Sequence, residues 1–85
     1  MTVQVTVRYF ASLREALGKG SEALDTDAAT LGALRRELAA RGGAYAQVLA
    51  PDRAVRMALD QVMAAESEPL RAGAEVALFP PVTGG

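Results

Sequence analysis

The sequence predicts a single α+β domain, in which a mixed β-sheet packs on one main helix. Three stretches support this fold class. Residues 2–10 alternate apolar and polar side chains, as a half-buried strand does. Residues 30–41 place leucines at the spacing of one helix face, and residues 74–79 alternate again before two prolines end the strand. The chain has 85 residues, 51% of them hydrophobic, which suffices for one domain with its own core.

The first predicted strand has one clearly apolar side. The side chains on that side are Val3, Val5, Val7 and Tyr9. Because these residues are expected to face the core, Phe10 falls on the opposite face. A large apolar side chain there indicates either a partner surface or a residue that packs under the following turn.

A short helix and a second strand are expected next. Ser12 and Glu15 have the spacing of a capping box, so the helix is predicted over residues 12–17, with Gly18 as its stop. Residues 22–25 are predicted to form a strand antiparallel to the first.

The main helix is predicted over residues 30–41, with Thr30 as its N-cap. The leucines that form its apolar stripe are Leu31, Leu34 and Leu38. We expect these leucines to enter the core and Arg35 and Arg36 to face water.

The second half of the chain alternates short elements. Residues 45–49 suit a further helical turn, residues 55–59 a strand, and residues 62–64 a short extended segment. In the last strand, residues 74–79, the alternation predicts that Phe79 faces outward. Strands arranged around one long helix in this order form the β-grasp fold, which ubiquitin shares.

Composition excludes several classes of function. The formal net charge is −1 and there is no basic stripe, so we expect no nucleic-acid partner. No apolar run is long enough for a membrane span, and the start at Met1 lacks a signal peptide, so we expect a cytoplasmic protein. The sequence contains no Cys and no His, so disulfides, thiol catalysis and the usual transition-metal sites are not expected. We predict that no side chain of this protein is itself catalytic.

The last six residues predict a different kind of reactive group. We expect residues 1–79 to form the domain and residues 80–85 an extended tail, which can span roughly 20 Å. Gly84 and Gly85 lack a Cβ and can enter a narrow channel. The terminal carboxyl is ionised near neutral pH. It can therefore attack the α-phosphate of ATP, giving an acyl-adenylate that is open to sulfur, amine or oxygen nucleophiles.

The sequence resembles the small subunit of molybdopterin synthase, a family of ubiquitin-like sulfur carriers. The resemblance rests on VRYFASLRE at residues 7–15, TLGALR at residues 30–35, Pro69-Leu70, and EVALFPPVTGG at residues 75–85. The specific part is the ending, in which an aromatic residue precedes Pro-Pro-Val-Thr-Gly-Gly. The helix match is generic.

The resemblance implies that an E1-like enzyme adenylates Gly85 with ATP and that a sulfur donor enzyme converts it to a thiocarboxylate. The tail then donates sulfur to cyclic pyranopterin monophosphate inside the large subunit, with which the chain is expected to form a heterotetramer. On this basis the chain is the sulfur-donating subunit of a transferase complex. It binds no cofactor or metal itself, and ATP is used by the activating partner.

The resemblance also assigns site residues. Val82, Thr83 and Gly84 match the part of the tail that is inserted into the large subunit. The residues that match the family's contacts with its partner are Phe10, Arg14, Met63 and Phe79.

Other functions use the same ending. A sulfur carrier for thiamine, for a thiolated tRNA base or for cysteine would share the terminal chemistry, and a ubiquitin-like modifier would form an isopeptide from the same adenylate. A plain interaction domain with an inert tail is the remaining alternative. The Gly-Gly ending alone does not separate these functions.

Overall fold

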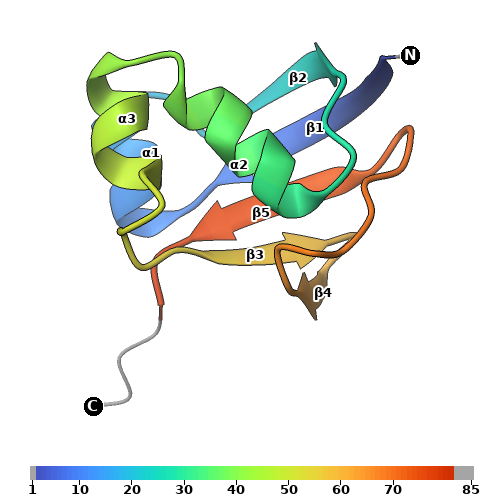
Figure 1. Ribbon diagram of the computed structural model, residues 1–85. Coiled ribbons are helices and arrows are strands. Elements are labelled where there is room, and N and C mark those ends of the chain that lie inside the picture. Colours follow the sequence, from blue (N-terminus) through green and yellow to red (C-terminus); the bar gives the residue numbers. More distant parts are fainter. Residues whose placement is uncertain (1, 82–85) are drawn as a thin grey trace.

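The computed structural model describes residues 2–81 and confirms the α+β fold, with three helices on one face of a mixed five-stranded sheet (Figure 1). The strands are β1 (Val3–Tyr9), β2 (Ser21–Thr26), β3 (Arg56–Leu59), β4 (Val62–Ala64) and β5 (Glu75–Phe79). The helices are α1 (Ala11–Leu17), α2 (Leu31–Ala39) and α3 (Gly43–Leu49). The strand order is β2-β1-β5-β3-β4.

Strand β5 lies at the centre of the sheet. It pairs in parallel with β1, where Val7 is opposite Val76, and antiparallel with β3, where Met57 is opposite Leu78. Both Val76 and Leu78 are fully buried under the helices. The predicted core side of β1 is correct for Val5, Val7 and Tyr9, which are also fully buried. Within residues 2–81, no helix lies on the opposite, outer face of the sheet (Figure 1).

Helix α2 begins as predicted. The side chain of Thr30 accepts a hydrogen bond of 3.1 Å from the backbone N–H of Ala33, and the three stripe leucines have no exposed surface. The loop before β5 then crosses the start of this helix. The N–H of Gly32 donates to the carbonyl of Glu66 at 2.8 Å, and a Cβ on Gly32 would lie 3.0 Å from the Glu66 Cβ. A side chain at position 32 would therefore push against the loop at Glu66, and glycine leaves the room that this close approach needs.

The prediction that Arg35 faces water is wrong. Its side chain is only 4% exposed, and its guanidinium donates to the carbonyls of Leu49 at 3.0 Å and of Ala50 and Arg53 at 2.6 Å each. A further bond of 2.9 Å reaches the Glu66 carboxylate. These carbonyls end α3 and begin the following loop, so they have no helical donors of their own. Arg35 therefore joins α2, α3 and two loops.

The start of α1 and the extent of α3 also differ from expectation. Helix α1 begins at Ala11, and no side chain caps it, so the predicted Ser12–Glu15 capping box does not form. The chain turns through Ala11 with a φ of 52°, which places Ser12 inside the helix. Gly18 ends α1 in the left-handed conformation, as predicted. The expected single turn at residues 45–49 is a separate helix, α3.

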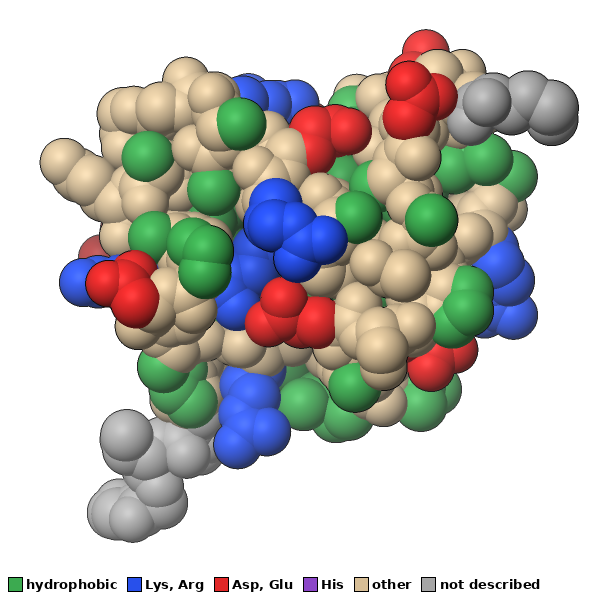
Figure 2. All heavy atoms as spheres, in the orientation of Figure 1, with side chains coloured by type: hydrophobic (Ala, Val, Ile, Leu, Met, Phe, Trp, Pro, Cys, Tyr) green, Lys and Arg blue, Asp and Glu red, His purple; other side chains and the backbone are tan. Residues whose placement is uncertain are grey.

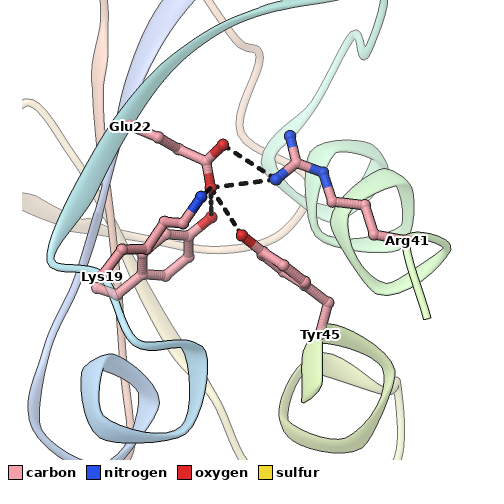
Figure 3. Close-up of polar contacts among 5 residues, drawn as sticks. Lys19, Glu22, Arg41 and Tyr45 are labelled. Atoms are coloured by element: carbon pink, nitrogen blue, oxygen red, sulfur yellow. Dashed lines mark hydrogen bonds and ion pairs between the residues drawn. The ribbon is translucent and has the colours of Figure 1, made fainter. Parts of the chain in front are cut away.

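A carboxylate under the helices collects polar contacts from several elements. Figure 3 shows Lys19, Arg41 and Tyr45 converging on Glu22 of β2. Arg41 donates at 2.9 Å, and the hydroxyls of Tyr9 and Tyr45 donate at 2.8 and 3.2 Å. The Glu22 side chain is 16% exposed. This cluster ties β1 and β2 to the end of α2 and the start of α3.

The contacts shift the pKa values of the cluster. Burial raises the pKa of Glu22, but the hydrogen bonds from Tyr9 and Arg41 and the positive charges of Arg41 and Lys19 outweigh it, so the pKa lies below its ordinary value. Burial, together with the bond to Glu22, raises the pKa of Tyr9. The cluster therefore favours an ionised Glu22 beside a neutral Tyr9.

We predict that Glu22→Gln lowers the free energy of unfolding at pH 7 by about 1–3 kcal/mol, because the donors lose a charged acceptor. Since the pKa of Glu22 is lowered on folding, its stabilisation is complete above the unfolded value of about 4.3 and is lost as pH falls through the folded value. Urea titrations from pH 6 to pH 3 should show a weaker acid dependence for Glu22→Gln than for wild type. Glu68→Gln, at an exposed site, should retain the wild-type dependence, and equal acid slopes for Glu22→Gln and wild type would contradict the prediction.

We predict that Arg35→Met lowers the free energy of unfolding by about 3 kcal/mol, because the carbonyls of Leu49 and Arg53 lose their donor and the Glu66 carboxylate loses its partner. Arg36→Met is the matched control, since the neighbouring side chain is exposed, and should change stability by less than about 0.5 kcal/mol. Chemical denaturation measures both. Equal free energies of unfolding for the two variants would show that the hydrogen bonds of Arg35 do not stabilise the fold.

Candidate functional site

The outer face of the sheet carries a shallow apolar groove, which we call the outer groove. Its lining residues are Arg8, Phe10, Ala58, Gln61, Met63, Glu75, Ala77 and Phe79. The strand register places Ala77 of β5 between Arg8 of β1 and Ala58 of β3, so the two alanines form the floor of the outer groove. Met63 of β4 lies beyond Ala58. The two alanines leave room between larger side chains on both sides, so the groove can accept an apolar side chain.

Two aromatic residues form one wall of the outer groove. Phe10 follows β1 and Phe79 ends β5, and the backbone N–H of Phe10 donates to the carbonyl of Leu78 at 3.1 Å. Their rings meet edge to face, with centroids 6.5 Å apart and planes at 82°. Such a pair contributes about 0.5–1.5 kcal/mol beyond its buried area. Phe10 nevertheless remains 39% exposed, so this wall presents apolar surface to solvent.

Met63 forms the other wall, at the edge of the sheet. Asp60 and Gln61 have φ values of 49° and 70°, as a two-residue hairpin turn between β3 and β4 requires. The turn brings Met63 opposite Ala58, and the Met63 side chain is 57% exposed. Val62 is 67% exposed, but it pairs with Leu59 and points to the other side of the sheet.

Arg14 does not line the outer groove. It lies on α1, in a separate shallow depression with Lys19, Gly18 and Gly20. A Cβ on Gly20 would approach the Arg14 Nε to 3.3 Å, so the missing side chain makes room for the guanidinium. The structure therefore brings Phe10, Met63 and Phe79 together in the outer groove and places Arg14 in a separate depression.

The predicted tail begins where the outer groove ends. Strand β5 stops at Phe79, and Pro80 and Pro81 follow directly. Val82, Thr83, Gly84 and Gly85 lie outside the described residues, so their predicted roles, and the division into residues 1–79 and 80–85, stay predictions.

Sequence reasoning missed several residues of the outer groove. Ala58, Ala77, Arg8 and Gln61 were not singled out, because each is unremarkable alone. Strand alternation places Arg8 on the same face as Phe10, and the register between strands, which a sequence pattern does not reveal, brings the alanines between them.

The chemistry available in the outer groove is limited. Its lining includes one carboxylate, Glu75, and no hydroxyl or amine that could act as a nucleophile. Among residues 2–81, no group of three or more metal-ligating side chains gathers. On the opposite face, acidic and basic side chains lie next to one another (Figure 2). The apolar walls and shallow shape of the outer groove suit the binding of a partner's side chains.

No helix within residues 2–81 is both long enough and apolar enough to span a membrane.

Comparison with known proteins gives a consistent family. A model of the ThiS family matches residues 7–85. The molybdopterin synthase sulfur carrier subunit of Escherichia coli is 38% identical over 81 residues, which cover 95% of this chain and 99% of that protein. The small archaeal modifier protein SAMP1 of Haloferax volcanii has a similar structure, with a TM-score of 0.77, 32% identity, and coverage of 96% of this chain and 99% of that one.

A complex of a similar chain with its partner is also known. Subunits 1 and 2 of the molybdopterin-converting factor from Helicobacter pylori form a protein–protein complex. One chain of that complex is 27% identical to this one, with a TM-score of 0.64 over 98% of this chain and 100% of its own length.

Proposed function

The chain belongs to the ThiS family, and we propose that it is the sulfur carrier subunit of a molybdopterin synthase. One observation carries the proposal. The outer groove and the root of the Gly-Gly tail meet at Phe79, the last residue of the central strand. A partner that docks on the outer groove is therefore positioned to receive the tail.

The proposed chemistry belongs to the terminal carboxylate of Gly85. One of its oxygens attacks the α-phosphate of ATP on an E1-like enzyme, and pyrophosphate leaves. Hydrosulfide released by a donor enzyme then attacks the acyl carbon and displaces AMP, so that its sulfur stays on that carbon as a thiocarboxylate. The thiocarboxylate sulfur attacks a carbon of cyclic pyranopterin monophosphate, from which an oxygen leaves as water. Water then cleaves the bond between the sulfur and the Gly85 carbonyl carbon, which leaves the sulfur on the product and restores the carboxylate. The chain itself supplies a carrier and no catalytic side chain.

The proposed partner for the last step is the large synthase subunit, in a heterotetramer. Phe10, Phe79 and Met63 would supply the apolar contact, and Arg14 would supply a charge from its separate depression on α1. Val82, Thr83 and Gly84 would enter the partner's active site ahead of Gly85. We expect adenylation and sulfur transfer to take place in the cytoplasm, where ATP is available.

A second candidate function is protein modification. The likeness to a small archaeal modifier protein favours it, because that fold matches at a TM-score of 0.77. The adenylate would then be attacked by a lysine amine. Conjugates of higher mass in host extracts, absent when the terminal glycine is deleted, would support the modifier function.

We predict that Gly85→Ala slows adenylation and sulfur transfer, because a Cβ crowds the reacting carboxylate. The wild-type chain, incubated with the E1-like enzyme, ATP and a sulfur source, should gain the mass of one oxygen-to-sulfur exchange at Gly85. The variant should gain it more slowly. Wild-type chain without ATP is the control. A wild-type chain that never shifts in mass, or a variant that supports normal molybdopterin formation, would count against the proposal.

We predict that Phe79→Ala weakens binding to the large subunit by at least about tenfold, because an aromatic anchor at the centre of an interface is lost. Isothermal titration with the purified large subunit measures the affinity. Val62→Ala is the matched control, since it truncates an exposed apolar residue outside the outer groove, and should bind within about twofold of wild type. An unchanged affinity for Phe79→Ala would remove this face from the interface.

A further inference from the structure

The one basic side chain in the outer groove is held in place from two sides. The Arg8 guanidinium lies 5.4 Å from the centre of the Phe10 ring, where a cation–π contact is favourable. Its Nη1 also approaches the Glu75 carboxylate at 3.4 Å, across the β1–β5 pair. These contacts keep the guanidinium over the groove wall.

Most of the hydrogen-bonding capacity of Arg8 is still available. A guanidinium has five N–H donors, and among the described residues this one makes a single long contact. The side chain is 48% exposed. Exposed pairs of this kind contribute little to stability, so the Arg8–Glu75 contact does not by itself account for an arginine here.

The charges near the groove favour an acidic partner. Arg56 lies opposite Phe79 on the neighbouring strand and, like Arg8, is exposed. The carboxylate of Asp60 is already paired with Arg71 at 3.2 Å. Arg8 and Arg56 therefore outnumber Glu75, the one carboxylate that lines the outer groove, so this part of the surface carries an excess positive charge although the whole chain has a net charge of −1.

We propose that Arg8 determines which partner binds, by donating hydrogen bonds from the free edge of its guanidinium to a carboxylate of the large subunit. An apolar side chain of the same partner occupies the space above Ala58 and Ala77. The planar guanidinium binds a carboxylate in a defined orientation, so this contact sets the register of the partner along the groove. The inference rests on the proposed function, because it takes the large subunit as the partner.

The test measures association of the full chain with the purified large subunit by stopped flow over a range of salt concentrations. Arg8→Leu keeps an apolar side chain but removes the charge. It should slow association about tenfold at low salt and flatten the salt dependence. Arg36→Leu is the matched control, because it makes the same charge change on exposed surface of α2, and should retain the wild-type salt dependence.

The double variant Arg8→Glu/Glu75→Arg separates a partner contact from an internal one. The variant keeps an ion pair between β1 and β5 but exchanges the two charges. The partner's carboxylate therefore meets a carboxylate at position 8. We expect binding at least as weak as for Arg8→Leu. Thermal melts of all variants check that folding is unchanged.

Two results would overturn the inference. One is wild-type association for Arg8→Leu, and the other is wild-type binding by the double variant, which would mean that only the internal pair matters. Phe79→Ala shows whether a negative result concerns Arg8 alone or the whole docking face. If Phe79→Ala weakens binding and the Arg8 variants do not, only the role of Arg8 is wrong. If none of them weakens binding, the outer groove is not the docking face.

Discussion

The burial of strand β5 between β1 and β3 is the constraint on which the rest of the structure depends. One face of β5 packs in the core, and the other face forms part of the outer groove. Val76 and Leu78 are fully buried under the helices, while Ala77 and Phe79 belong to the outer groove. Because side chains alternate along a strand, a shift of one residue would exchange these faces. The packing of the core therefore fixes where the outer groove lies and where the strand ends.

The helical side holds the buried polar networks, and the outer side carries the apolar walls of the outer groove. Arg35 and Glu22 each gather groups from elements that are distant in sequence, and each is nearly buried. Such networks are costly when incomplete, because a buried charge without partners loses its hydration. Here the partners are present, and no buried side-chain nitrogen or oxygen among the described residues lacks one. The helices that cover one face of the sheet are thus held in place by these contacts, and the other face of the sheet is available for binding.

Local patterns predicted most of the fold, and non-local contacts account for the errors. Alternation in β1 and leucine spacing in α2 each report directly on burial. Arg35 was misassigned on its charge, although its position four residues after Leu31 places it on the apolar side of the helix. Ser12 and Glu15 have the spacing of a cap, but the turn at Ala11 starts the helix one residue earlier. The outer groove needed the strand register, which depends on the whole sheet.

The central position of β5 also has a mechanical consequence. A force applied to the chain beyond Phe79 acts along this strand, and β5 is hydrogen-bonded to a neighbour on each side. The bonds of both ladders are then loaded together in shear, and Val76 and Leu78 must leave the core at the same time. Extraction of the strand therefore requires the sheet to come apart as a whole, and its rate is set by global unfolding. An enzyme that pulls on this end of the protein must therefore unfold the entire domain.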